Sequence, residues 1–191
     1  YLAEAMDRYA QFGIDVETIP SPTPNETPLG LIHGRVDVSW DGPMRVLVHH
    51  DRDPQGPLVC FGQVVGPDPF MLLGREPNQA FRFADLLGKR IGVMGEVPTP
   101  WMTLQDDLGR AGIDPESLDR GPERSMAQNV AALAAGELDV IQVMEPYAST
   151  AMGEGIGHLW HRFSQRGPIA FTTFYTTRAF VNDRPEACAA L

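Results

Sequence analysis

The sequence predicts a two-lobed α/β fold, and three observations lead to that prediction. The chain has 191 residues, of which 43 % are hydrophobic and 21 % are charged, the ordinary balance of a globular protein that buries a core. Apolar residues recur at helical spacing and then alternate as they do in strands, so helices and strands follow one another along the chain. The same order of elements returns about a hundred residues later, which indicates an internal duplication.

The first copy begins with a predicted helix that ends at Gly13, because glycine readily takes the left-handed conformation of a helix end. Residues 14–18 alternate as a strand, and the proline-rich run at 20–24 closes it. A second helix ends near Gly34, and a strand is expected at 36–40. The apolar face of the first helix consists of Leu2, Ala5, Met6, Tyr9 and Ala10.

The second copy begins with a predicted strand at 89–94, which leads into a helix. Both copies carry Gly-Ile-Asp, at 13–15 and 112–114, and then Leu-x-x-Gly-x-x-Asp-Val, at 31–38 and 133–140. These strings fall at equivalent points of the same helix–strand–helix–strand order, so we infer a duplication that gives two similar lobes. The apolar stripe of the helix consists of Trp101, Leu104, Leu108 and Ala111.

Four further strands are expected to carry the chain between the lobes. Residues 58–65 and 70–73 lead out of the first lobe, and residues 158–163 and 169–177 return to it. Two crossings make a hinge and a cleft. Strands that alternate with helices favour parallel sheets covered on both faces, with a ligand beyond the carboxyl ends of the strands. We therefore expect lobe 1 at 1–66 and 168–191, truncated at both ends, and lobe 2 at 67–167.

Charge and residue spacing exclude several classes of function. A net charge of −10 repels nucleic acid and anionic lipid. No apolar run approaches the roughly 20 residues of a membrane span, and no signal segment is visible. Cys60 and Cys188 lack the spacing of metal or redox pairs, and on a strand His158 and His161 would point to opposite faces. We expect neither a metal nor another cofactor.

The order of motifs resembles the nitrate/sulfonate/taurine-type (NitT/TauT) solute-binding proteins of ABC transporters, a family that includes binders of thiamine pyrimidine precursors. The resemblance implies a type II periplasmic-binding fold, an extracytoplasmic location, and delivery of a small molecule from the interlobe cleft to a membrane permease. We expect such a protein to be a monomer and not an enzyme. The resemblance rests on residues 9–17, 32–38, 83–93, 132–140 and 145–147.

Two other functions on the same architecture are alternatives. A related class of pyrimidine-precursor-forming enzymes uses histidine and iron on this fold. An effector-sensing domain of a transcription regulator has a similar architecture but is attached to a DNA-binding module.

The first candidate ligand residues follow the strands of the first lobe. The loop Trp40-Asp41-Gly42 leaves the carboxyl end of a strand, where an indole and a carboxylate would face the cleft. The alternative is a buried tryptophan beside an aspartate that caps the next helix. Gln63 lies within the strand at 58–65, and its amide would point either to the cleft or to solvent.

The equivalent loop of the second lobe contributes Pro98, Thr99 and Trp101 at a helix N-terminus, whose free N–H groups suit an anion. The prolines at 98 and 100 remove two of those donors, which weakens an anion site. The alternative is that Thr99 caps the helix and Trp101 packs in the core.

Gln142 and Glu145 end another strand of the second lobe, in a place that resembles a family ligand-contact position. A carboxylate there accepts hydrogen bonds from an amino group. The alternative is an exposed glutamate before a helix-opening proline. Asp41 and Glu145 in one cleft would repel nitrate or a simple sulfonate, so we expect a neutral or cationic nitrogen-containing ligand, with an aminopyrimidine stacked on Trp40 and Trp101 as a candidate.

Overall fold

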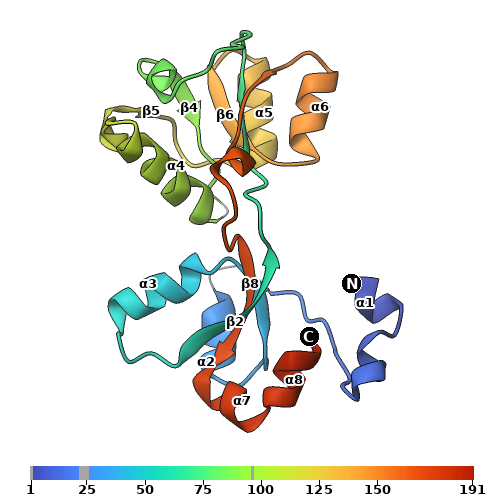
Figure 1. Ribbon diagram of the computed structural model, residues 1–191. Helices are drawn as coiled ribbons and strands as arrows, with labels where there is room; N and C mark the ends of the chain where they lie inside the picture. The colour runs from blue at the N-terminus through green and yellow to red at the C-terminus, as the bar shows by residue number, and fades with distance from the viewer. Residues whose placement is uncertain (1, 22–25, 96) are drawn as a thin grey trace. The chain divides into compact units, whose positions relative to one another are not determined.

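The structure is a computed structural model, and it describes residues 2–21, 26–95 and 97–191. The chain forms two compact units, each of which is drawn in Figure 1. Unit 1 combines the chain up to Val65 with Ala170–Leu191, and unit 2 is Gly66–Ile169. The chain therefore passes between the units twice.

Unit 1 is built around a small antiparallel sheet with the order β1-β8-β2. The late strand β8 lies between the two early strands and pairs with each of them in antiparallel register. The sheet therefore joins segments that are more than a hundred residues apart in the sequence. Its elements are α1 (Leu2–Ala5), η1 (Tyr9–Phe12), α2 (Thr27–Ile32), β1 (Ser39–Asp41), α3 (Met44–Arg52), β2 (Leu58–Val65), β8 (Thr172–Thr177), α7 (Arg178–Asp183) and α8 (Pro185–Ala190).

The core of unit 1 is small. Leu58 and Tyr175 have no exposed surface, and Leu31 and Val46 are nearly as buried. Burial raises the pKa of the Tyr175 hydroxyl well above its ordinary value, and the charge of Asp41 adds to that shift. This core joins α2, α3 and the sheet into one body.

Unit 2 contains a five-stranded mixed sheet with the order β5-β4-β6-β3-β7. The strands β4, β5 and β6 are parallel, whereas β3 is antiparallel to both β6 and β7. Figure 1 shows α4 on one side of this sheet and α5 and α6 on the other. The elements are β3 (Met71–Gly74), η3 (Phe83–Leu86), β4 (Arg90–Gly92), α4 (Thr99–Arg110), η4 (Pro115–Ser117), β5 (Asp119–Arg120), α5 (Met126–Ala134), β6 (Val140–Val143), α6 (Tyr147–Gly153), β7 (His158–Arg162) and η5 (Phe163–Arg166).

The core of unit 2 fills the space between this sheet and its helices. Apolar side chains from the strands meet the apolar stripes of α4 and α5, and each fully buried leucine or isoleucine contributes about 1.5–3 kcal/mol through its transfer from water. The members without exposed surface include Leu72, Leu73, Ile91, Leu104, Leu108, Leu133 and Ile141.

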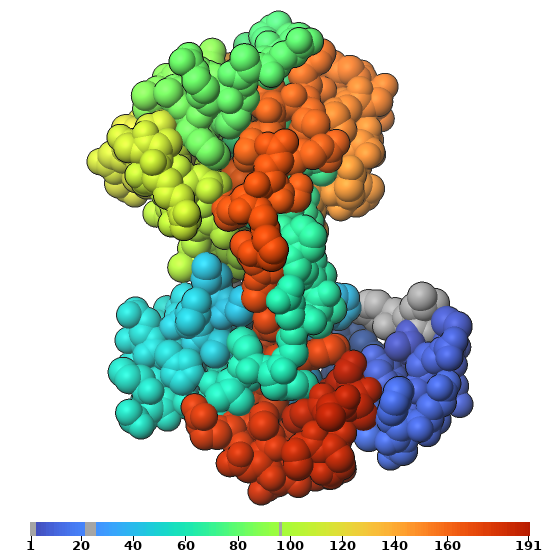
Figure 2. Space-filling view, viewed as in Figure 1, coloured from blue at the N-terminus to red at the C-terminus, as the bar shows by residue number. Residues whose placement is uncertain are grey.

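The two segments that join the units run side by side, as Figure 2 shows. The amide N–H of Ile169 donates to the carbonyl of Gly66 at 2.8 Å, and that of Phe171 donates to the carbonyl of Val65 at 2.9 Å. Closer to the sheet of unit 2, the N–H of Phe163 donates to the carbonyl of Phe70 at 3.0 Å. Backbone hydrogen bonds therefore tie the two connecting segments together.

The repeated glycines take the conformation that the sequence predicts. Gly13, Gly34, Gly112 and Gly136 have φ between 65° and 74°. In each case the glycine N–H donates to the carbonyl three residues earlier, and the next N–H donates to the carbonyl five residues before it. The two copies of each motif therefore share the same local geometry.

Several predicted elements are wrong in the first copy. The helix expected to run to Gly13 is broken after Ala5, where Asp7 takes φ 51°. Residues 14–18 form no strand, and the strand expected at 36–40 is the shorter Ser39–Asp41. The sheet of unit 1 is antiparallel rather than parallel, because its third strand comes from the far end of the chain. Of the proline-rich stop at 20–24, residues 22–24 lie outside the described residues.

Candidate functional site

Trp40 is an exposed indole held in place by a hydrogen bond. It lies in β1 with 53 % of its surface exposed, and its Nε1–H donates to Oγ1 of Thr172 in β8 at 3.0 Å. Tryptophan side chains are on average highly buried in folded proteins. Because the N–H is already occupied, the ring face is what Trp40 offers to a molecule in solution.

Asp41 points to the other face of β1, because neighbouring side chains of a strand alternate. Its carboxylate accepts a hydrogen bond from the Gly42 N–H at 2.7 Å and forms an ion pair with Arg45, the second residue of α3. The Arg45 side chain is only 6 % exposed. Asp41 therefore holds the start of α3, and its charge is compensated by Arg45. That Trp40 and Asp41 contact a ligand stays a prediction.

Gln63 lies in the same row of the sheet as Asp41. Thr173 in β8 is the register partner of both residues, one on each side. Gln63 is exposed and Thr173 is buried. Unit 1 thus brings Asp41 and Gln63 onto one face of the sheet and leaves Trp40 on the other.

In unit 2 the predicted residues meet at one edge of the sheet, where the parallel strands β4, β5 and β6 reach their carboxyl ends. Pro98 immediately precedes α4, and no side chain caps that helix. Thr99 is its first residue and is 5 % exposed, so the alternative that Thr99 caps the helix is wrong. Glu96, in the same loop, lies outside the described residues.

Trp101 is half-buried and carries a cation on its ring. The guanidinium of Arg120, the last residue of β5, lies 4.0 Å from the centroid of the indole. An arginine over a tryptophan face is an attractive cation–π contact. One face of Trp101 is therefore covered by an exposed positive charge, which the spacing of residues along the sequence does not reveal.

Gln142 is fully buried, and its Nε2–H donates to the carbonyl of Pro100 at 3.0 Å. Thr103 donates to the same carbonyl through Oγ1 at 3.1 Å. Gln142 therefore joins β6 to the first turn of α4, and its side chain does not reach the surface in this structure.

Glu145 is exposed at the loop after β6. Its Oε2 accepts a hydrogen bond from the N–H of Ser149 in the first turn of α6 at 3.0 Å. A carboxylate at a helix N-terminus is stabilised by the free N–H groups and by the helix dipole. Glu145 both caps α6 and keeps its charge at the surface.

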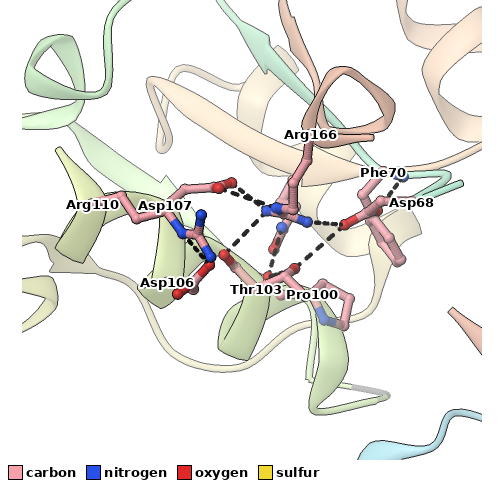
Figure 3. A network of polar contacts seen from close by, with 9 residues as sticks. Asp68, Phe70, Pro100, Thr103, Asp106, Asp107, Arg110 and Arg166 are labelled. Atoms are coloured by element: carbon pink, nitrogen blue, oxygen red, sulfur yellow. Dashed lines mark hydrogen bonds and ion pairs between the residues drawn. The ribbon is translucent and has the colours of Figure 1, made fainter. Parts of the chain in front are cut away.

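A charged network that the sequence reasoning missed lies beside this edge, and Figure 3 shows it. Arg166 donates to Asp68 at 2.9 Å and to both carboxylate oxygens of Asp107, one of them at 3.0 Å. Burial, the largest single influence, lowers the pKa of Arg166, but the hydrogen bonds and charges of Asp107 and Asp68 raise it above its ordinary value overall. In the sequence, only the spacing of Thr103 and Asp107, which lie one helical turn apart, could have indicated this network.

Among residues 2–21, 26–95 and 97–191 no three His, Cys, Asp or Glu side chains are grouped as metal ligands would be. His161 lies among Phe81, Phe83 and Phe163, and its burial lowers its pKa. Over the same residues no helix is both long and apolar enough to cross a membrane.

Comparisons with known proteins match the chain over nearly its whole length. A family model described as NMT1/THI5 like matches residues 1–191. The protein YtlA of Bacillus subtilis (strain 168) is 25 % identical over 188 residues, which are 97 % of this chain and 56 % of YtlA. The chain therefore spans little more than half the length of that relative.

Solved structures share the fold at lower identity. The periplasmic aliphatic sulphonate binding protein SsuA of Escherichia coli has a TM-score of 0.79 at 17 % identity, over 96 % of this chain and 62 % of that chain. The nitrate-binding protein NrtA of Synechocystis PCC 6803 has a TM-score of 0.66 at 18 % identity, over 99 % of this chain and 54 % of that chain. The predicted periplasmic-binding-protein-like α/β fold is thereby confirmed.

Proposed function

We propose that this chain, which belongs to the NMT1/THI5-like family, binds a small polar solute for an ABC importer. The resemblance to NitT/TauT binding proteins led us to expect that family. In this proposal the units 1–65 with 170–191 and 66–169 correspond to the two lobes expected from the sequence at 1–66 with 168–191 and at 67–167. The solute is released to a membrane permease.

The observation that carries this proposal is Trp40. An indole that is 53 % exposed and yet fixed by a hydrogen bond to Thr172 presents a rigid apolar plate to solution. Exposed and ordered aromatic rings are characteristic of binding surfaces, since they add contact area at a small cost in side-chain entropy. A flat heterocycle or an alkyl group fits such a plate.

We propose that the solute contains nitrogen. Glu145 is exposed at the end of β6, where its carboxylate can accept hydrogen bonds from an amino group. The charge of Asp41 contributes little to this preference, because Arg45 compensates it. The exposed Arg120 guanidinium on Trp101 lies at the same sheet edge as Glu145. An amino compound that also carries an acidic group therefore fits this edge better than a simple cation.

The proposal includes the setting of the protein. We place it outside the cytoplasmic membrane, as a monomer whose partners are the solute and the permease, with no nucleic acid, metal or other cofactor. The net charge of −10 supports the exclusion of nucleic acid. The protein is proposed to bind its solute without converting it.

Thermal unfolding in the presence of candidate solutes tests this function. A ligand at a hundredfold excess over its Kd stabilises the folded state by about 2.7 kcal/mol, which for a chain of this size is a shift of about 5–10 °C. We expect 4-aminopyrimidine or 2-aminoethanesulfonate to produce such a shift, and nitrate to produce none. Stabilisation by nitrate alone, or by no compound of the panel, would contradict the proposed ligand class.

Trp40→Ala identifies the binding surface in the same assay. The variant is expected to lose the ligand-induced shift and to keep its unfolding temperature without ligand within about 2 °C, because the side chain is mostly exposed. Phe12→Ala removes another exposed aromatic ring of unit 1 and is the matched control. Equal ligand-induced shifts in both variants would exclude Trp40 from the site.

The enzyme and regulator alternatives are tested separately. An enzyme would convert its ligand, so recovery of 4-aminopyrimidine unchanged after prolonged incubation with the protein and iron supports binding alone. A sensing domain would be joined to a DNA-binding module, which the full reading frame would reveal.

A further inference from the structure

The first turn of α4 is held by two side chains from different parts of unit 2. The carbonyl of Pro100 accepts hydrogen bonds from Nε2 of Gln142 at 3.0 Å and from Oγ1 of Thr103 at 3.1 Å. Gln142 has no exposed surface and belongs to the central strand β6. The end of α4 that lies at the candidate ligand edge is therefore attached directly to the sheet.

Arg166 attaches the same helix at two further points. Its guanidinium donates to the carbonyl of Thr103 at 3.1 Å and to the carboxylate of Asp107, one turn later. It also donates to Oδ2 of Asp68 at 2.9 Å, while Oδ1 of Asp68 accepts from the N–H of Phe70 at 2.9 Å. Figure 3 shows Arg166 between α4 and Asp68.

The two charged partners come from the two segments that join the units. Asp68 follows the first crossing of the chain by two residues, and Arg166 precedes the second crossing by three. Asp68 is 1 % exposed, and the side chains of Arg166 and Asp107 are 16 % and 11 % exposed. The network thus connects both crossings to the first two turns of α4 and is largely shielded from water.

We propose that Arg166 is a positioning residue, which holds the first turn of α4 on the two connecting segments in the geometry needed for ligand binding. This inference rests on the proposed function, since it assumes that the ligand contacts the edge where α4 begins. Arg166 does not itself touch the ligand. It acts through Thr103 and Pro100, and the planar fork of its guanidinium reaches all three of its partners at once.

The matched control lies on the same helix. Arg110 pairs with Asp106 at 2.7 Å, but these side chains are 76 % and 53 % exposed. Arg166→Met removes a largely buried guanidinium and leaves the carboxylates of Asp68 and Asp107 without their partner. Arg110→Met removes an exposed ion pair, which contributes little to stability. Because Arg166→Met can unfold unit 2 altogether, Thr103→Val is a second variant that removes one hydroxyl at nearly constant volume, and Thr103→Ser restores that hydroxyl.

Hydrogen–deuterium exchange of the folded proteins tests the inference without any ligand. We expect the amides of residues 102–104, which are the first of α4 with helical hydrogen bonds, to exchange at least tenfold faster in Arg166→Met and threefold faster in Thr103→Val, with α5 unchanged. Thr103→Ser and Arg110→Met should exchange like the wild type. Unchanged exchange at 102–104 in both Arg166→Met and Thr103→Val, or an equal increase throughout unit 2, would overturn the positioning role.

Affinity for 4-aminopyrimidine, measured by calorimetry at a temperature where every variant is folded, provides the second readout. We expect Kd to rise at least tenfold in Arg166→Met and to stay within twofold in Arg110→Met. If Arg166→Met binds as the wild type does, the positioning role is refuted. If the wild type does not bind 4-aminopyrimidine, the same affinities are measured with 2-aminoethanesulfonate. If it binds neither solute, the proposed ligand class is wrong, and the exchange experiment alone decides the role of Arg166.

Discussion

Replacing Asp139 by asparagine is expected to destabilise unit 2, although the same change at the equivalent position of the first copy should not. Asp139 accepts hydrogen bonds from the Arg90 N–H at 3.0 Å, from Nε and an Nη of Arg90 at 3.0 and 2.8 Å, and from Arg75 at 3.3 Å. Asp37, its counterpart in the repeated motif, is exposed and forms no side-chain hydrogen bond or ion pair with the described residues.

The size of the effect follows from these contacts. A hydrogen bond to a charged group contributes about 1.5–3 kcal/mol, and asparagine would keep only one acceptor oxygen. The Asp139 and Arg90 side chains are 21 % and 43 % exposed, and solvent weakens the charge interaction. We therefore expect Asp139→Asn to lower the free energy of unfolding by about 2 kcal/mol and Asp37→Asn by less than about 0.5 kcal/mol.

Acid should remove the difference between the wild type and Asp139→Asn. Hydrogen bonds from Arg90, together with the charges of Arg90 and Arg75, hold the pKa of Asp139 below its usual range. The unfolded chain, with an aspartate pKa of about 3.9, then binds this proton more readily than the folded chain. The stabilisation is complete above about pH 5, begins to be lost below about pH 4, and is lost fully only as the pH falls through the lowered pKa of the folded state.

Urea unfolding at pH 7 and pH 3.5, followed by far-UV circular dichroism, measures these quantities. Equal free energies of unfolding for Asp139→Asn and Asp37→Asn at pH 7 would show that the Arg90 contacts of Asp139 do not stabilise unit 2. A difference from the wild type that is as large at pH 3.5 as at pH 7 would show that the charge of Asp139 is not involved. Asp139 lies before β6, at the opposite end of the strand from Glu145, so its replacement should not alter ligand affinity.

Three other predictions concern stability. Burial lowers the pKa of His161, so protonation of this side chain opposes folding. The free energy of unfolding should therefore fall as the pH decreases below about 6.5. His161→Phe should remove this part of the pH dependence when thermal unfolding is compared at pH 7.5 and pH 5.5. A Cβ at Gly74 would overlap the indole of Trp160, so Gly74→Ala should lower the free energy of unfolding in urea by about 1–3 kcal/mol. A Cβ at Gly109 in α4 would contact no other atom, so Gly109→Ala should not destabilise unit 2. The Thr177 side chain accepts from the Phe180 N–H at 3.2 Å, so Thr177→Ala should lower the free energy of unfolding by about 1 kcal/mol, and no change would exclude the cap.

Local signals in the sequence predicted local structure well. The left-handed glycine at 13 and the strand Leu58–Val65 were predicted correctly, because turn chemistry and residue alternation are properties of short segments. The helix expected before Gly13 was not, because its apolar face does not reveal the break at Asp7. Strand partners were also missed: alternation shows that 172–177 is a strand but not that it lies between β1 and β2.

The candidate site shows the same limit. Trp40 lies within β1, one residue before its end, and Glu145 follows β6 by two residues, so both are close to the carboxyl ends of strands as the sequence predicts. The burial of Gln142 and the contact of Arg120 with Trp101 depend on segments that are distant in the sequence. Asp41 and Arg45 are four residues apart in the sequence, a spacing at which opposite charges pair. That spacing predicts a smaller negative charge at the ligand site than we expected.

Native mass spectrometry of the purified protein tests whether the chain binds such a solute, because it detects a molecule that co-purifies and reports its mass. We expect one small polar molecule containing nitrogen per chain, recovered unchanged and absent from Trp40→Ala. A chain that carries no molecule after incubation with the candidate solutes, or one that carries the same molecule when Trp40 is replaced, would contradict this expectation.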